Sequence, residues 1–210
     1  MSGSRNGRAG IRQLFFVLVW LAAAGLQAGA LVGKAAPELK LPGSDGKVHS
    51  LKAYKGKTVV LEWLNQGCPF VRKHYDSGNM QALQKEQAAK GVVWLSVVSS
   101  APGREGYFKD AAEAMAFAKE SGGAAQAILL DPQGKVGRAY GAKATPHMVV
   151  IDKQGKLAYM GAIDDRPSTN KDDVQGAKNY VRQALDELAA GKAVSEPETK
   201  AYGCSVKYAD

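Results

Sequence analysis

The chain has 210 residues, 45% of them hydrophobic and 23% charged, and a formal net charge of +8 at pH 7. These values are ordinary for one globular domain that buries a full core without disulfide staples. Its two cysteines, Cys68 and Cys204, are too few for a disulfide framework or a zinc cluster. The charges form no run of five of one sign, which argues against nucleic-acid binding.

The N-terminus has the pattern of a targeting segment. Three arginines precede an apolar stretch at 14–26, and Ala28-Gly29-Ala30 fits a signal-peptide cleavage site. We therefore predict a signal peptide at 1–30, cleaved after Ala30, and export to the periplasm. Because the apolar stretch is short for a spanning helix, which needs roughly 20 residues, an uncleaved N-terminal membrane anchor is the alternative.

The rest of the chain is predicted to form one domain at 31–191 and a polar tail at 192–210 that carries Cys204. Export would place both in an oxidising compartment, where disulfides persist. The two cysteines are therefore candidates for pairing.

Apolar, β-branched stretches predict strands, and helical periodicity closed by glycine predicts helices. A turn-rich segment with two weak strand candidates, at 36–41 and 48–51, comes first. The main strands are predicted at 58–64, 92–98, 127–130, 147–151 and 156–160, and the helices at 69–90 with a break at 77–79, at 110–120, at 136–140 and at 172–190.

The end of this order indicates the fold class. The last two strands are joined by the turn Asp152-Lys153-Gln154-Gly155 and form a hairpin. The helix at 172–190 has the strongest period, with Asp172 or Asp173 as its cap. Strands that alternate with helices before a terminal hairpin indicate an α/β fold, with helices flanking a mixed central sheet.

Cys68 follows the strand at 58–64 and precedes a helix that Pro69 can begin, since the first helical turn needs no N–H from that residue. Free N–H groups and the helix dipole would favour a thiolate and lower the pKa of Cys68 from the free value of roughly 8.5. Arg72 and His74 follow within two turns and add positive charge. A lone cysteine is otherwise a small buried apolar residue, but the flanking glycine and proline favour a reactive or disulfide-forming thiol.

The run from Glu62 to Val71, the Thr145-Pro146 pair before a strand, and the element order resemble the thioredoxin superfamily. Within it, the sequence is most similar to the peroxiredoxin-like branch (redoxin, alkyl hydroperoxide reductase/thiol-specific antioxidant). The ending Tyr202-Gly203-Cys204-Ser205-Val206-Lys207-Tyr208 also resembles redoxin tails. The resemblance implies a thioredoxin-like three-layer fold and a thiol-dependent oxidoreductase without a bound cofactor.

The resemblance also implies roles for single residues. Cys68 falls at the attacking cysteine, and Glu62 at a buried carboxylate that handles protons. Pro146 falls where family members hold a cis peptide bond beside the cysteine, and the backbone of Thr145 would pair with an extended substrate chain. Pro69 completes the expected substrate-binding residues.

The sequence departs from both family signatures. Thioredoxins have a second cysteine where Val71 stands, which excludes a dithiol reductase contained in one motif. Peroxiredoxins have threonine or serine where Asn65 stands, and proline where Leu61 stands, to orient the peroxide. The substrate is therefore open between a peroxide and a protein disulfide, with an external thiol as the reductant.

Cys204 is the remaining candidate partner for Cys68. It lies 13 positions after Gly191, and that length spans at most roughly 40 Å, about the breadth of such a domain. We expect Cys204 to resolve oxidised Cys68. The alternatives are a structural or intermolecular bridge, or an idle thiol in the tail.

For several other features the sequence leaves two interpretations open. Glu62 either transfers protons with a raised pKa or is satisfied by a nearby lysine. His74 and His147 invite comparison with copper chaperones, but Arg72 stands where that class needs a second cysteine, so we predict no metal site. The alternative to an enzyme is a non-catalytic module that binds peptides beside Pro146 with an inert Cys68.

Overall fold

The structure is a computed structural model that describes residues 1, 3 and 29–210. The predicted signal peptide at 1–30 therefore lies almost entirely outside the described residues. Among the residues that are described, no helix is both long enough and apolar enough to cross a membrane.

A five-stranded sheet forms the middle layer. Its strands are β3 (Val59–Trp63), β4 (Val93–Val98), β5 (Ala127–Leu130), β7 (His147–Ile151) and β8 (Leu157–Gly161). They lie in the order β5-β4-β3-β7-β8. The first three are parallel to one another, and β7 and β8 run antiparallel to their neighbours. The predicted mixed sheet and its terminal hairpin are confirmed.

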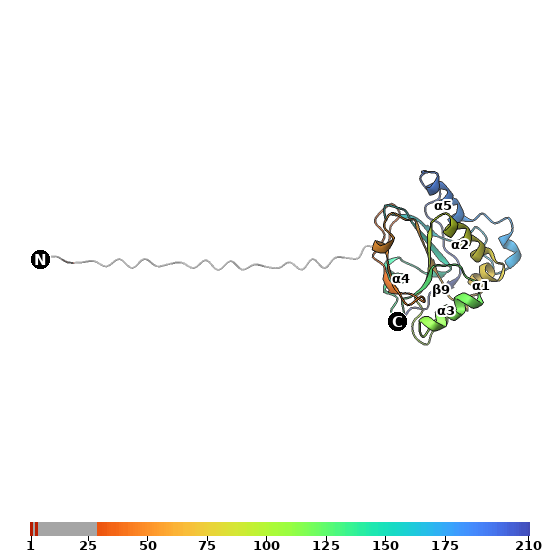
Figure 1. Ribbon diagram of the computed structural model, residues 1–210, viewed down its shortest axis with the longest axis horizontal. Coiled ribbons are helices and arrows are strands. Elements are labelled where there is room, and N and C mark those ends of the chain that lie inside the picture. Colours follow the sequence, from red (N-terminus) through yellow and green to blue (C-terminus); the bar gives the residue numbers. More distant parts are fainter. Residues whose placement is uncertain (2, 4–28) are drawn as a thin grey trace.

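Helices cover both faces of this sheet (Figure 1). One face carries α1 (Pro69–Asp76), α2 (Asn79–Ala89), α3 (Ala111–Glu120) and α5 (Tyr180–Ala189). The other face carries the short helix α4 (Lys135–Ala139), the hairpin of β1 (Lys40–Pro42) and β2 (Val48–Ser50), and the 3-10 turn η1 (Leu51–Tyr54). The predicted α/β fold with flanking helices is therefore confirmed.

The central strand serves both cores because side chains alternate across a strand. Val60 and Leu64 pack with Cys68 in the core beneath α1 and α2. Leu61 and Trp63 pack into the opposite core, and every residue of β3 is buried. This burial on both faces explains why the sequence is an almost unbroken apolar run that ends just before Cys68.

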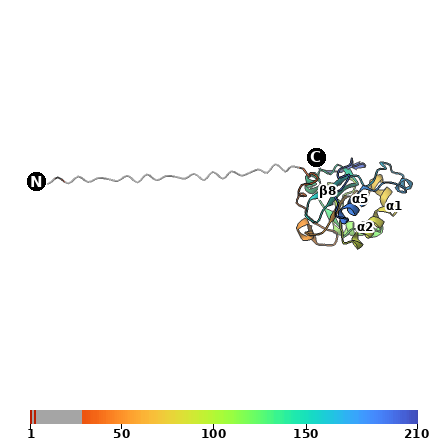
Figure 2. The same cartoon turned by 90° about the horizontal axis from the view of Figure 1, so that it is seen from above.

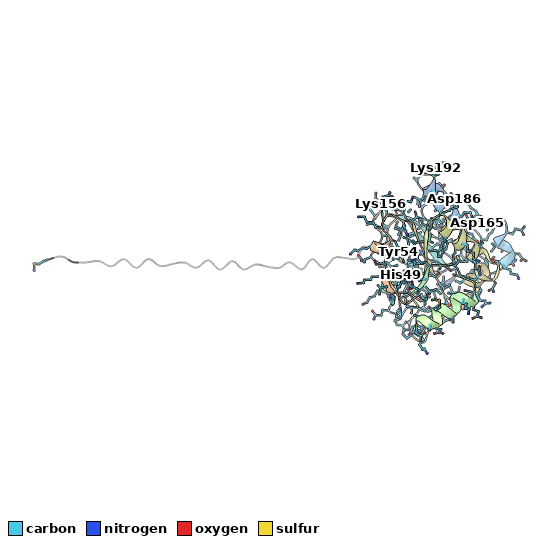
Figure 3. All side chains as sticks on the ribbon, in the orientation of Figure 1. His49, Tyr54, Lys156, Asp165, Asp186 and Lys192 are labelled. Atoms are coloured by element: carbon cyan, nitrogen blue, oxygen red, sulfur yellow. The ribbon has the colours of Figure 1, made fainter. Side chains whose placement is uncertain are left out.

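The hairpin of β1 and β2 is fixed by a side-chain network that Figure 3 labels in part. His49 and Tyr54 lie side by side there and are joined by a hydrogen bond. The other ring nitrogen of His49 lies 2.9 Å from Asp45 Oδ1. This network lies on the side of the sheet opposite the core that contains Cys68.

The predicted helix at 172–190 is wrong in its first half. Residues Lys171–Val174 form only the 3-10 turn η2, and α5 starts at Tyr180. Gly176 interrupts the pattern with a φ of +76°. The cap is Asn179, whose side chain accepts a hydrogen bond of 2.8 Å from the backbone N–H of Arg182, and not Asp172 or Asp173.

The tail at 192–210 is ordered against the domain. Its strand β9 (Cys204–Ser205) pairs antiparallel with the short strand β6 (Ala144–Thr145). Figures 1 and 2 both show the C-terminus against the body of the domain. The strand in this segment escaped sequence analysis because its partner lies far away in the chain and only two residues pair.

Candidate active site

Cys68 is positioned by the turn between β3 and α1. Its backbone N–H donates to Asn65 O at 3.1 Å, while the N–H of Gly67 donates to Asn65 Oδ1 at 2.9 Å. Cys68 is the N-cap of α1, and Pro69 occupies the first helical turn. The predicted place of the thiol, at a helix N-terminus directly after a buried strand, is confirmed.

The loop before β7 completes the surroundings of the thiol. The peptide bond between Thr145 and Pro146 is cis, as predicted. Cys68 Sγ lies 3.1 Å from Thr145 O and donates to it in its thiol form. Two segments that are 77 positions apart therefore meet at the sulfur.

The tail brings Cys204 to the same place. Cys204 pairs with Thr145 in the β6–β9 ladder, and its side chain packs against the buried cluster that contains Cys68. Both cysteines are free thiols, and Cys68 is 0% exposed. The tail therefore returns to the loop that carries Cys68. Its length showed only that it could reach this loop.

Gly203 allows this close approach. Its φ is +134°, and a Cβ at this position would lie 2.0 Å from Thr145 O. Real Cβ atoms do not approach backbone oxygens so closely, so only glycine lets the tail lie this near to Thr145. In the tail sequence Tyr202-Gly203-Cys204, position 203 must therefore be glycine for Cys204 to reach its place beside Thr145.

One expectation about Thr145 is wrong. Its backbone was expected to be free for an extended substrate chain, but it is already paired with Cys204. A peptide-binding module with an inert Cys68 would need this same edge beside Pro146. The structure fills that edge with the chain's own tail.

Hydrogen bonds favour the thiolate of Cys68. Burial acts to raise the pKa of Cys68, but hydrogen bonds to the sulfur outweigh it and the pKa is lowered from its ordinary value. The contact with Thr145 O opposes this effect because it stabilises the thiol form. The groups that lower the pKa are the Cys204 and Thr145 side chains and the backbone N–H groups of Val71 and Cys204.

Cys204 is shifted in the opposite direction. Burial, the hydrogen bond to Cys68 and the negative charges of Cys68 and Glu105 raise the pKa of Cys204 to about 12. Of the two sulfurs, Cys68 is therefore the nucleophile, while Cys204 stays a protonated thiol beside it.

Glu62 is enclosed by neutral donors. Tyr75 OH donates to its Oε1 at 3.0 Å, and Gln84 Nε2, Trp94 Nε1 and Ser96 Oγ donate to its Oε2 at 3.1, 2.9 and 3.2 Å. Burial raises the pKa of Glu62. The suggested lysine partner is wrong, since four uncharged groups satisfy this carboxylate. A proton-transfer role for Glu62 stays a prediction.

A second polar cluster, which sequence analysis missed, lies behind Cys68. It joins Lys73 and His74 of α1 to Asp164, which follows β8, and to Tyr202 of the tail. No local pattern in the sequence points to Asp164. The sequence signals were His74, which follows Cys68 by six residues, and Tyr202, two residues before Cys204.

His147 lies apart from this cluster. It packs edge-on against Trp63 at a centroid distance of 6.0 Å, and neither ring nitrogen has a hydrogen-bond partner. Burial, with a smaller effect of Lys143, lowers its pKa to about 4. In the part of the chain that the structure describes, no group of three or more His, Cys, Asp or Glu side chains is arranged to hold a metal ion.

Comparison with protein-family models identifies the family. The Redoxin model matches residues 31–180, which is most of the chain. The chain belongs to the Redoxin family. It is a Redoxin-family thiol oxidoreductase, and Cys68 lies within the matched region while Cys204 lies beyond it. No curated protein matches the sequence.

Solved structures support the fold of this Redoxin-family chain. An uncharacterized conserved protein from Geobacillus kaustophilus is 27% identical, with a TM-score of 0.72 over 85% of this chain and 93% of the other. Peroxidoxin BcpB from Mycobacterium tuberculosis is 20% identical, with a TM-score of 0.53 over 77% and 97%. The thioredoxin domain of a thiol-disulfide oxidoreductase from Bacteroides vulgatus is 21% identical, with a TM-score of 0.51 over 70% and 97%. The last two likenesses show the fold alone.

Proposed function

We propose that this Redoxin-family protein is a two-cysteine thiol peroxidase. Cys68 attacks a small hydroperoxide, and Cys204 then forms an internal disulfide with it. The observation that carries the proposal is that Thr145, whose carbonyl oxygen accepts from the fully buried Cys68 thiol, pairs directly with Cys204 in the β6–β9 ladder and so brings the second thiol to the first.

The strand β9, which lies over Cys68, favours a small oxidant as the substrate. A protein disulfide would have to place its sulfur against Cys68 and its backbone along the edge that Cys204 already occupies. A hydroperoxide needs only room for two oxygen atoms and a path to the sulfur. Local opening of a short strand provides such a path at low cost, because only two residue pairs join β6 to β9.

The reaction balances without a cofactor. The Cys68 thiolate attacks the distal oxygen of ROOH, the O–O bond breaks, and Cys68–SOH and RO⁻ form; the alkoxide then takes a proton to leave as ROH. The Cys204 sulfur attacks the sulfenic sulfur and releases water, which gives the Cys68–Cys204 disulfide. Two external thiols reduce this disulfide and leave as a disulfide themselves.

The exposure of the two sulfurs supports one direction for the reduction. Cys204 is partly exposed, whereas Cys68 is buried. An external thiolate therefore attacks Cys204, and Cys68 leaves as the better-stabilised thiolate. The reductant is a thiol that reaches the outer side of β9.

Two assays with matched variants test the proposal. The reduced protein should consume hydrogen peroxide, Cys68→Ser should abolish this, and Cys204→Ser should allow one turnover that stops at the sulfenic acid. Peptide mapping without reductant should find the Cys68–Cys204 bond only in the wild type. If both thiols remain free and alkylatable after peroxide treatment, the proposal fails.

Protein disulfide reduction is the second candidate, and the partial exposure of Cys204 favours it. Insulin disulfide reduction that depends on Cys68 and exceeds peroxide consumption would decide for this activity. Export is a further proposal, supported by the targeting pattern at 1–30. Its test is N-terminal sequencing of the mature protein, where a chain that starts near Leu31 supports cleavage and an intact membrane-bound chain supports an anchor.

A further inference from the structure

Tyr202 connects the tail to the helix that begins at Cys68. Its hydroxyl donates a hydrogen bond to Asp164 Oδ1 and lies 3.3 Å from His74 Nε2. Its ring meets Phe70 of α1 edge-on, with centroids 5.8 Å apart. Because Tyr202 stands two residues before Cys204, these contacts fix the approach of the tail to the active sulfur.

The cluster behind Tyr202 is charged and buried. The side chains of Lys73 and Asp164 are 0% and 2% exposed, and Lys73 Nζ lies 3.7 Å from Asp164 Oδ2. Lys73 Nζ also donates to Arg166 O at 2.7 Å, and the backbone N–H of Arg166 donates to Asp164 Oδ1 at 3.0 Å. Burying an ion pair is costly, and such pairs contribute little to stability compared with apolar packing. This cluster is better explained by a role in holding the tail in one position relative to α1.

The positions of the hydrogens decide which groups of this cluster donate and which accept. Asn79 Nδ2 donates to His74 Nδ1 at 2.9 Å, so the hydrogen of neutral His74 is on Nε2 and points to the Tyr202 oxygen. Tyr202 can then donate its one hydrogen only to Asp164. Burial lowers the pKa of His74 to about 4, so the ring is neutral at neutral pH. Each donor in this series of hydrogen bonds, from Asn79 through His74 and Tyr202 to Asp164, has one acceptor. The hydrogens can therefore be placed in only one way.

The second anchor of the tail lies on the other side of Cys204. Tyr208 OH donates to Ala142 O at 2.8 Å, and the guanidinium of Arg138 lies 4.5 Å from the Tyr208 ring centroid. This anchor holds the tail to the α4 side of the domain. Among the hydrogen bonds and ring contacts of residues 29–210, Tyr202 is the tail residue that meets the side chains of α1, whose N-cap is Cys68.

We propose that Tyr202 and Asp164, supported by Lys73 and His74, are positioning residues that set how fast Cys204 resolves oxidised Cys68. This inference rests on the proposed two-cysteine reaction. A tethered thiol reacts in proportion to the fraction of time it spends in the reactive geometry. In the hydrogen bonds of the described residues neither Tyr202 nor Asp164 touches Cys68, so their loss removes no contact of the attacking sulfur and should not slow the first oxidation by peroxide.

The separation of the two steps gives the test. In Tyr202→Phe, the loss of the hydrogen bond to Asp164 should slow disulfide formation about tenfold, while the rate of Cys68 oxidation by hydrogen peroxide is not lowered, since a looser tail opens the path to the sulfur. More Cys68 should then proceed to sulfinic acid at high peroxide, which intact-mass spectrometry measures. Tyr140→Phe is the matched control, because it also removes a buried hydroxyl, bonded to Pro37 O at 2.7 Å, away from the tail.

A second variant separates position from packing. Asp164→Asn keeps an oxygen that accepts from Tyr202, so its disulfide rate should lie between those of the wild type and Tyr202→Phe. Equal disulfide rates and equal sulfinic fractions in the wild type and Tyr202→Phe would overturn the inference. If the wild type forms no Cys68–Cys204 disulfide with peroxide, the proposed function fails first, and the two failures are thereby distinguished.

Discussion

Thr145 and Cys204 are direct antiparallel partners although 59 positions separate them in the chain. Thr145 Oγ1 also donates to Cys204 O at 3.4 Å, and Thr145 O accepts from the Cys68 thiol at 3.1 Å. One residue beside a cis-proline thus contacts both cysteines. The edge at which a substrate strand was expected to pair is here taken by the part of the chain that carries the second thiol.

Gly203→Ala should open this arrangement. A Cβ at residue 203 would collide with Thr145 O, so β9 has to move away from β6. Cys68 should then react with a small alkylating reagent at least about tenfold faster, since alkylation of a buried thiol follows the population of the open form. Mass spectrometry of timed samples measures this rate.

The matched control is Gly191→Ala. Gly191 has a φ of +71°, but nothing lies within 4 Å of a Cβ placed there. Both variants carry backbone strain of about 1 to 3 kcal/mol, but only the one at residue 203 meets the active loop. Equal alkylation of Cys68 in the two variants would contradict the steric role of Gly203.

The hydrogen bond from Cys204 should be visible in the titration of Cys68. Cys204→Ser keeps a hydroxyl donor beside the sulfur, whereas Cys204→Ala removes it. The pKa of Cys68 should therefore be higher in Cys204→Ala than in Cys204→Ser, by about one unit. Thiolate absorbance in the ultraviolet, recorded against pH, checks this difference. Equal pKa values of Cys68 in the two variants would contradict a contribution of the Cys204 side chain.

His147 should contribute to loss of stability in acid. Its pKa is about 4 in the folded protein, below the unfolded value of about 6.5. The unfolded chain therefore binds the proton first, and the free energy of unfolding falls by about 1.4 kcal/mol per pH unit as the pH drops through this window. Urea unfolding at several pH values should show a shallower fall in His147→Leu. His74 has a similar pKa of about 4, so part of the fall should remain.

Glu62 should be more important as an acceptor than as a charge. Glu62→Leu leaves the buried donors of Tyr75, Trp94 and Ser96 without their acceptor, while Gln84 keeps its contact with Tyr75 OH, and should lower the free energy of unfolding by about 3 to 5 kcal/mol. Glu62→Gln keeps an acceptor and should cost much less. Because burial raises the pKa of Glu62, its stabilising contribution is present at low pH and is lost as the pH rises through the folded value. The glutamine variant should lack this loss in urea unfolding experiments.

The features of the site that come from local sequence were predictable. The apolar run into β3, the cysteine at the start of α1 and the hairpin of β7 and β8 each follow from a pattern within about ten residues. Such patterns reflect burial and helix capping, and both act over short distances along the chain.

The errors came from long-range packing. Val174 and Ala177 fit a helical period, but Gly176 and the cap at Asn179 delay the helix by several residues. The pairing of Thr145 with Cys204 and the bond from Tyr202 to Asp164 join segments with no common pattern. Only three-dimensional packing could reveal that the tail fills the edge beside Pro146.

The distance between the two cysteines along the chain gives oxidation a thermodynamic consequence. A bond between Cys68 and Cys204 would close a loop of 136 positions, which encloses most of the domain. Chain entropy alone would then make the oxidised protein more stable than the reduced protein by about 4 to 5 kcal/mol. Each catalytic cycle would thus raise and lower the free energy of unfolding by restricting and freeing the unfolded chain, and melting temperatures measured with and without reductant would report the redox state.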